Sequence, residues 1–270
     1  MKPLTNIQSL SQYKKNKLKQ KIFVLSVQIS LLCLLIFLWE LFANIGLINS
    51  FLVSKPSAIV TLLFEYIKSN TLWPHIRISV IETILGLILG TLIGFIIATL
   101  LYLFPLLSKI LDPYLIVLNA LPKTALAPIL IIWAGTNIKG IVVVSISLSL
   151  IVTIISTLTY FKSVDENIIK MMKTLGANKI QILYKIIYPS NLDNLLSIIK
   201  VNIGMSWVGV IVGEFLVSRE GIGYLVVYGG QVFKLDLVMM GVFILAIIAL
   251  IMYQIVNIIE WIIHKKIKKK

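Results

Sequence analysis

Polar and charged side chains inside long apolar segments are the residues of this sequence that could do chemistry. Two segments each carry a set that we predict to line a path for a solute, because polar groups in a membrane are costly and commonly mark such a path. The sets are Asn119, Pro122, Lys123 and Thr124, and Lys200, Asn202, Ser206 and Glu214. An anionic solute would suit the two lysines or the helix N-termini beside Pro122 and Pro128. The alternative is that both lysines extend to the membrane surface.

The remaining ionisable residues predict no catalytic centre or metal site. Glu82 and Arg77 lie near one end of the second apolar segment, where we expect an ion pair. His75 and His264 are not spaced as metal ligands, and a single cysteine, Cys33, cannot form a disulfide within the chain. The sequence has no glycine-rich phosphate loop ending in Gly-Lys-Ser/Thr. We therefore expect no bound cofactor and no ATP hydrolysis by this chain.

Composition predicts that these side chains are positioned by membrane helices. The chain has 270 residues, 59% of them hydrophobic and 13% charged, with a mean hydropathy of +0.99. A soluble domain carries about 25% charged residues. Long apolar runs without alternation exclude a barrel and predict an all-α membrane protein with about six transmembrane helices. The expected spans are 22–45, 78–104, 113–134, 138–161, 190–217 and 237–263.

The distribution of lysine predicts the orientation of these spans. Most of the 25 Lys and Arg residues fall in a basic N-terminal segment, 1–21, in the loop 162–189 and in a basic tail, 264–270. Basic residues concentrate on the cytoplasmic side of membrane proteins, so both termini and this loop are expected there, in the cell membrane. Because the charges flank apolar segments, nucleic-acid binding is not indicated. The permeation domain is 22–263, and its outer segment 46–76 is expected to hold a surface helix from Ala58 to Lys68.

The loop 162–189 predicts two short helices outside the membrane. Apolar residues at 168, 169, 172 and 175 have helical spacing, acidic residues precede them, and Gly176 follows. A second helix from Asn178 would place Ile180, Leu183, Tyr184 and Ile187 on one face before Pro189 ends it. Amphipathic helices of this kind suit a groove on a partner protein. The alternative is that both apolar stripes rest on the ends of the spans.

The loop also resembles a known family. Gly176 followed after nine residues by Ile186-Ile187-Tyr188-Pro189 resembles the EAA loop of permease subunits of binding-protein-dependent ABC importers. Two departures are that Lys170-Met171-Met172 stands where the family has Glu-Ala-Ala, and that Tyr188 replaces a leucine.

Further motifs resemble the nitrate, sulfonate and taurine branch of this family. The stretch 121–128 with Ile132-Trp133-Ala134-Gly135 is similar to one branch signature. Val212-Gly213-Glu214 followed by Gly221-Ile222-Gly223-Tyr224-Leu225 is similar to a second, and His75 with Ser79 matches a third. These motifs span about 200 residues, and their combination is specific for the family although each motif alone is weak.

The resemblance implies the architecture of an ABC type I importer. Two permease chains, expected as a homodimer in the bilayer, would enclose the path, two cytoplasmic ABC ATPase subunits would use ATP, and an extracytoplasmic binding protein would deliver a small solute such as nitrate or a sulfonate. The loop would transmit ATPase motion to the spans. The residues expected to couple are Glu166, Lys170, Met171, Met172, Leu175, Gly176, Ala177, Ile186 and Pro189.

Small residues repeat every four positions in the second span, at Gly86, Gly90, Gly94 and Ala98. Such a stripe lets helix backbones approach closely, and we expect packing within the chain, with a dimer seam or pathway wall as the alternative.

Two other functions are weighed against an importer permease. A secondary transporter or channel would work without an ATPase, and an intramembrane enzyme would need a catalytic constellation that the sequence does not show.

Overall fold

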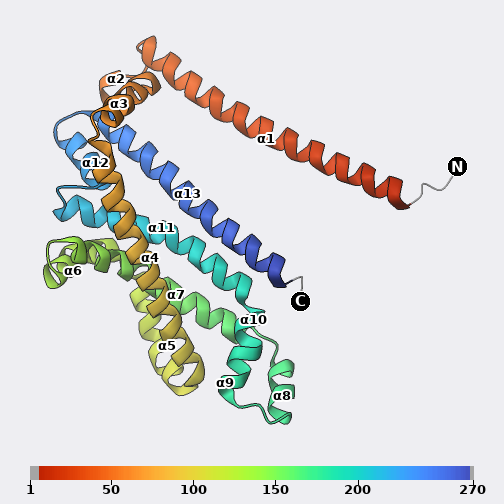
Figure 1. The fold of residues 1–270 in the computed structure, drawn as a ribbon. Coiled ribbons are helices and arrows are strands. Elements are labelled where there is room, and N and C mark those ends of the chain that lie inside the picture. The colour runs from red at the N-terminus through yellow and green to blue at the C-terminus, as the bar shows by residue number, and fades with distance from the viewer. Residues whose placement is uncertain (1–5, 268–270) are drawn as a thin grey trace. The chain divides into compact units, whose positions relative to one another are not determined.

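The computed structural model describes residues 6–267, and of the basic ends predicted at 1–21 and 264–270 the outermost residues, 1–5 and 268–270, lie outside this range. Every regular element from 6 to 267 is helical, which confirms the all-α fold class (Figure 1). The chain forms two compact units, one up to Phe64 and one from Glu65 onward.

The first unit holds the first predicted span and the start of the surface helix. Helix α1 runs over Asn6–Asn44, α2 over Ser50–Val53 and α3 over Pro56–Lys68, so the predicted surface helix is present and begins two residues earlier. Glu40 of α1 accepts hydrogen bonds from the Ser57 backbone N–H at 3.0 Å and from its hydroxyl at 2.9 Å. A carboxylate at a helix N-terminus satisfies N–H groups that have no partner within the helix.

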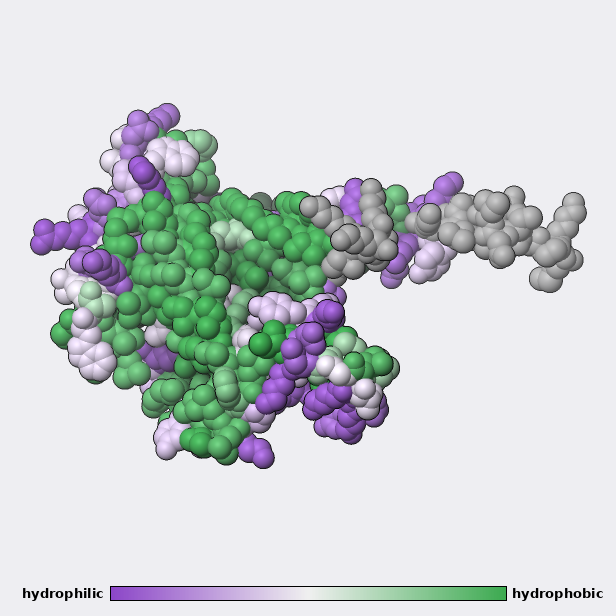
Figure 2. Space-filling model, turned by 60° about the horizontal axis from the view of Figure 1, so that its bottom comes forward, coloured by the Kyte–Doolittle hydropathy of each residue, from purple (hydrophilic) through white to green (hydrophobic). Residues whose placement is uncertain are grey.

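Five helices in the described residues are long and apolar enough to cross a membrane. One is the Lys15–Asn44 part of α1. The other four belong to the second unit: α4 (Leu72–Leu103), α7 (Ile138–Lys162), α11 (Leu192–Val217) and α13 (Leu235–Ile267). Hydrophobic residues cover most of the face shown in Figure 2. A surface of this kind requires lipid or other apolar neighbours.

The third predicted span, 113–134, is wrong as a single straight helix. The structure has α5 (Pro105–Ala120), a 3₁₀ turn η1 (Lys123–Leu126) and α6 (Ala127–Ala134), with an 85° bend at the break. Leu121 has an extended conformation directly before Pro122. Proline disfavours a helical conformation in the residue before it, so Pro122 accounts for the break.

Helices α4, α7 and α11 form the packed centre of the second unit. Gly86, Gly90 and Gly94 of α4 lie so close to α7 that an added Cβ would come within 2.0 to 2.6 Å of Ser145, Ser149 or Thr153. Helix α11 approaches the same serine, since a Cβ at Gly209 would lie 2.4 Å from Ser145 Cα. Small residues therefore allow all three backbones to approach closely.

The other helices of the second unit extend from this centre. The loop after α7 holds α8 (Glu166–Thr174), α9 (Lys179–Ile182), a π-helical turn η2 (Leu183–Ile187) and the short α10 (Tyr188–Ser190). Helix α12 (Ile222–Gln231) follows α11 and precedes α13. Figure 1 shows α8 and α9 at one end of the α7–α11 pair and α12 at the other. These two ends hold the candidate functional residues.

Candidate functional site

Sequence-encoded caps define the helices of the loop between α7 and α11. The Asp165 side chain accepts a hydrogen bond from the Asn167 N–H at 2.8 Å and begins α8. Asn178 and Gln181 exchange side-chain to backbone bonds of 2.8 and 2.9 Å, a capping box that begins α9. Gly176, between them, has φ +82°, and the N–H groups of Gly176 and Ala177 bond back to α8 in a Schellman-type ending. The turn between the two helices is therefore fixed by its sequence.

An apolar cluster anchors the loop to the spans. Ile182, Leu183 and Ile187 are buried with Phe161 of α7 and with Leu195 and Ile198 of α11. Tyr188 packs edge-on against Phe161, with 5.3 Å between ring centroids, and its hydroxyl lies 2.7 Å from Thr99 Oγ1 of α4. The tyrosine that departs from the family pattern thus adds a polar contact between the loop and a third helix.

Four large apolar side chains of the loop are more than half exposed. Their exposed fractions are 54% for Met171, 74% for Leu175, 58% for Ile180 and 68% for Tyr184. We call these four residues the outer loop face. Exposed apolar side chains gathered on short helices are characteristic of a binding surface.

The predicted apolar stripe of the second loop helix is wrong in one respect. Leu183 and Ile187 are buried, whereas Ile180 and Tyr184 belong to the outer loop face. Pro189 lacks the N–H that an α-helix would bond to the carbonyl of residue 185, and the chain adopts a π-helical turn there, which changes the angular spacing of the side chains. The other predicted loop residues differ in their burial. Met172 and Ala177 pack on the anchoring cluster, and Ile186 is half-buried. The exposed ones are Glu166, Lys170 and Pro189.

At the opposite end of the α7–α11 pair, three side chains cap helix α12. His75 Nδ1 accepts from the Gly221 N–H at 3.0 Å, Ser79 Oγ accepts from the Ile222 N–H at 2.8 Å, and Glu214 Oε2 accepts from the Gly223 N–H at 2.6 Å. The Ser79 hydroxyl donates to Glu214 Oε1 at 2.5 Å. We call His75, Ser79 and Glu214 the α12 cap. It satisfies three successive N–H groups that a helix N-terminus leaves unpaired.

The glycines of this motif make room for the cap. Gly221 has φ +106°, and a Cβ there would lie 2.3 Å from the Glu214 carboxyl carbon. A Cβ at Gly223 would lie 2.7 Å from Glu214 Oε2. Glu214 itself is 1% exposed, so in this structure it serves the cap and faces no opening.

The expected ion pair between Glu82 and Arg77 is wrong. Glu82 is 1% exposed and its carboxyl lies against that of Glu214, while Arg77 is exposed. Neither oxygen of Glu82 has a hydrogen-bond donor among the described residues. The two residues are five apart on α4, which places them on different sides of the helix.

Asn202 and Ser206, two of the predicted path residues, are buried between spans. The Asn202 amide donates to Thr91 Oγ1 of α4 at 2.8 Å and to Thr153 Oγ1 of α7 at 2.7 Å. Ser145 of α7 donates to the Ser206 carbonyl at 3.1 Å. In this structure both positions join helices of one chain, and neither lines an open surface.

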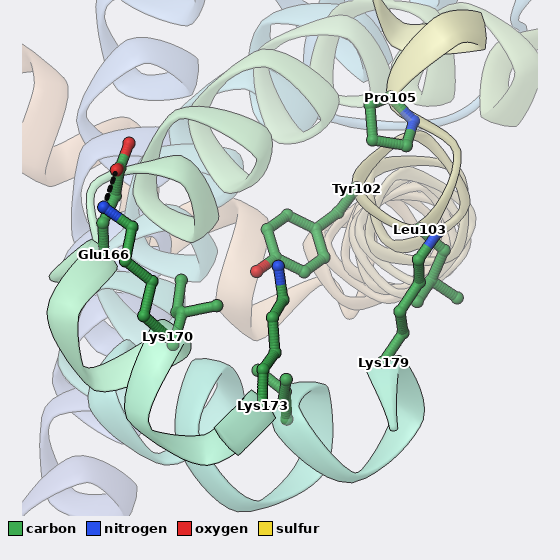
Figure 3. A pocket seen from close by; sticks show the side chains of 9 residues that line it. Tyr102, Leu103, Pro105, Glu166, Lys170, Lys173 and Lys179 are labelled. Carbon is green, nitrogen blue, oxygen red and sulfur yellow. Dashed lines mark ion pairs between the residues drawn. The ribbon is translucent and has the colours of Figure 1, made fainter. Parts of the chain in front are cut away.

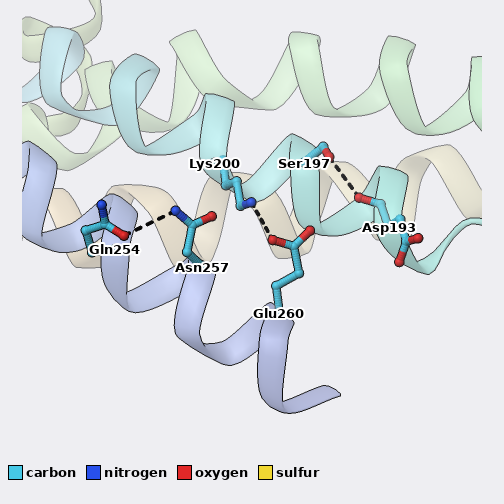
Figure 4. Close-up of polar contacts among 6 residues, drawn as sticks. All are labelled: Asp193, Ser197, Lys200, Gln254, Asn257 and Glu260. Carbon is cyan, nitrogen blue, oxygen red and sulfur yellow. Dashed lines mark hydrogen bonds and ion pairs between the residues drawn. The ribbon is translucent and has the colours of Figure 1, made fainter. Parts of the chain in front are cut away.

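Lys200, also predicted for the path, forms an ion pair that sequence reasoning missed. Its ammonium lies 2.5 Å from Glu260 Oε2 of α13 (Figure 4). It also lies 5.5 Å from the centre of the Tyr253 ring. The Lys200 and Glu260 side chains are 16% and 23% exposed. The ammonium thus neither extends to the membrane surface nor stands free for a solute. The only sequence signal was that each charge falls within an apolar segment.

The first predicted set gathers at the 85° bend. Lys123 Nζ lies 3.3 Å from both the backbone carbonyl and the side-chain oxygen of Asn119. Asn119, Pro122 and Thr124 are exposed and Lys123 is half-buried. The structure therefore brings this set together and leaves it accessible, in contrast to the buried set on α11.

Comparison with known proteins decides the family. Residues 90–269 match the family model described as binding-protein-dependent transport system inner membrane component. The chain belongs to this family. A protein of Haemophilus influenzae named "Probable ABC transporter permease protein" is 28% identical over 86% of this chain and 92% of its own length. The taurine transport system permease protein TauC of Escherichia coli is 25% identical over 84% of each chain. The riboflavin transport system permease protein RibX of Chloroflexus aurantiacus is 27% identical over 87% of this chain and 88% of its own.

The permease is thus an ABC importer subunit with multiple membrane spans. Two of its branch motifs acquire a physical meaning from the geometry. His75 and Ser79 from one motif and Glu214, Gly221 and Gly223 from another form or accommodate the α12 cap.

Proposed function

We propose that the permease forms the membrane path of an importer for a small anionic solute, as a dimer of identical chains. Two cytoplasmic ATPase subunits and an extracytoplasmic binding protein complete the assembly. A taurine permease among the relatives supports a sulfonate-like solute, and a riboflavin permease shows that relatives also serve other molecules. The accessible Lys123 at the bend supports an anion.

The observation that carries this proposal is the outer loop face. Capped ends and the buried anchor fix α8 and α9, while Met171, Leu175, Ile180 and Tyr184 stay exposed. We assign these four side chains to a groove on the ATPase, with Gly176 and Ala177 setting the turn between the helices. Because the loop contacts α4, α7 and α11 through Thr99, Phe161 and Leu195, force on it would reach all three central helices.

The proposed orientation places both termini and the loop 162–189 in the cytoplasm. Lys162, Lys170, Lys173, Lys179 and Lys185 lie in this loop, and basic residues favour that side. The α12 cap then lies toward the outside, where the binding protein delivers solute. We assign the path opening to the accessible set at the bend: Asn119, Pro122, Lys123 and Thr124.

Cysteine labelling tests the orientation and the ATPase contact. The chain has one cysteine, so Cys33→Ser provides a cysteine-free background. Leu175→Cys on the outer loop face should react with a membrane-impermeant maleimide only in inside-out vesicles, and Lys139→Cys at the other end of α7 only in intact cells. Adding the ATPase should protect Leu175→Cys and leave Lys139→Cys unchanged. Labelling of Leu175→Cys from outside would overturn the proposal.

A further inference from the structure

A cavity of about 400 Å³ lies between the loop helices and the ends of α4 and α5 (Figure 3). This volume is within the range of about 300–1,000 Å³ typical of small-molecule sites. The side chains around it are mostly cationic or apolar, with one carboxylate and one tyrosine hydroxyl among them. They are Tyr102, Leu103, Pro105, Glu166, Ile169, Lys170, Lys173, Lys179 and Ile182.

The cavity lies at the end of the candidate membrane span α4, where α5 begins. Tyr102 and Leu103 are the last two residues of α4, and Pro105 is the first of α5. Tyrosine is enriched at the ends of membrane spans because its ring is apolar and its hydroxyl polar. The opposite wall is made by α8 and α9, which carry the lysines. A ligand here would touch both the end of a span and the coupling loop.

The charges in the cavity do not balance. Glu166 and Lys170 pair with each other at 3.3 Å. Lys173 and Lys179 make no ion pair within residues 6–267, and Figure 3 shows Lys173 directed toward the wall with Tyr102 and Lys179 toward Leu103. Leu103, Pro105, Ile169 and Ile182 add apolar surface beside these two cations. The cavity thus suits a ligand with both an anionic and an apolar part.

The cavity and the outer loop face lie on opposite sides of α8. Helical residues follow one another by about 100°. Glu166, Ile169, Lys170 and Lys173 therefore cluster on one side of the helix, and Met171 and Leu175 point the other way. An ATPase seated on the outer loop face leaves the cavity accessible to a different ligand.

We propose that this cavity binds the phosphate of an anionic phospholipid headgroup. Lys173 and Lys179 contact the phosphate with the Tyr102 hydroxyl, and the apolar wall contacts the glycerol and upper acyl region. Basic pockets beside membrane helices recognise such headgroups. A free phosphate ion would use the cations and leave the apolar wall unoccupied, so the lipid matches more of the cavity. The bound lipid ties α8 and α9 to the ends of α4 and α5, and coupling by the loop then depends on membrane composition.

Native mass spectrometry of the purified full-length chain with equal phosphatidylglycerol and phosphatidylcholine tests this site. The wild type should retain phosphatidylglycerol preferentially. The Lys173→Gln/Lys179→Gln variant should bind it more weakly, by roughly fivefold per lysine removed. The matched control, Lys109→Gln/Lys185→Gln, removes the same charge from exposed positions outside the cavity and should bind as the wild type does.

Two outcomes would overturn the inference. Equal loss in both variants would show only general attraction to charge, and displacement of phosphatidylglycerol by millimolar inorganic phosphate would show a site for a soluble anion. Circular dichroism and elution volume establish that both variants fold. The inference relies on the proposed function for the cytoplasmic position of the loop, but lipid retention is measured on the isolated chain. Failure of the lipid test would not change the labelling result, and failure of the labelling test would not change the lipid result.

Discussion

The two ends of the α7–α11 helix pair differ in whether their groups find partners within the chain. At one end, the α12 cap satisfies three backbone N–H groups with side chains of the same chain, of which Ser79 and Glu214 are buried. At the other end, the outer loop face leaves four large apolar side chains more than half exposed. The first region is complete within one chain, whereas the second has the surface of half an interface. Substitutions in the cap should therefore affect folding, and those on the outer loop face should affect assembly.

Removing the Glu214 carboxylate should have the largest effect on stability. Glu214→Ala leaves the Gly223 N–H and the Ser79 hydroxyl without their buried acceptor, and we expect a loss of about 3 kcal/mol in unfolding free energy. Unfolding in detergent, followed by circular dichroism, measures it. Arg77→Ala is the control, because Arg77 is exposed on α4, forms no ion pair among the described residues and should cost under about 1 kcal/mol. Equal losses in both variants would contradict the cap.

Gly176→Val should have the next largest effect on stability. We expect a loss of about 1–2 kcal/mol in unfolding free energy, because a β-branched residue disfavours φ +82°. ATP-driven uptake in proteoliposomes should fall at least tenfold while membrane insertion persists. Gly204→Ala is the control: a Cβ meets nothing within 4 Å at either glycine, but Gly204 has no positive φ. Gly176→Asn should recover part of the uptake, since asparagine tolerates this conformation. Normal uptake by Gly176→Val would argue against a fixed turn.

Tyr188→Phe should have a smaller effect. It removes the hydroxyl that lies 2.7 Å from Thr99 and keeps the ring against Phe161, so we expect a loss of about 1 kcal/mol. Thermal unfolding measures it, and Thr99→Val should give a similar loss. The double variant should be no worse than either single one, and additive losses would show that the two hydroxyls act independently.

Leu175→Ser should leave stability unchanged within about 0.5 kcal/mol, because its side chain is 74% exposed. Its affinity for the ATPase should nevertheless fall, by roughly tenfold, since exposed apolar anchors contribute much of the free energy of such contacts. Pull-down or light-scattering titration with the ATPase measures this, and Leu106→Ser, at an equally exposed leucine of α5, is the control. Unchanged affinity would remove the outer loop face from the interface.

Local sequence patterns were enough to predict most of the spans and the loop helices. Apolar length located the spans, and Asp165, Gly176 and Asn178 located the loop helices. The pairing of Glu260 with Lys200, and of Thr91 and Thr153 with Asn202, could not be predicted, because each joins residues 49 to 111 positions apart. The break at Leu121–Pro122 had a local signal in its proline, yet the apolar run around it predicted a continuous helix. The π-helical turn at 183–187 was missed for a similar reason, since α-helical spacing was assumed up to Pro189.

The ion pair between Lys200 and Glu260 constrains how the spans can move. Any motion that drew α11 away from α13 at this level would leave two opposite charges unpaired in a poorly hydrated setting, at a cost of several kcal/mol. During a transport cycle α11 and α13 should consequently travel as one rigid body. Sliding and rocking are then left to contacts between small residues, such as those joining α4 and α7, where displacement separates no charges.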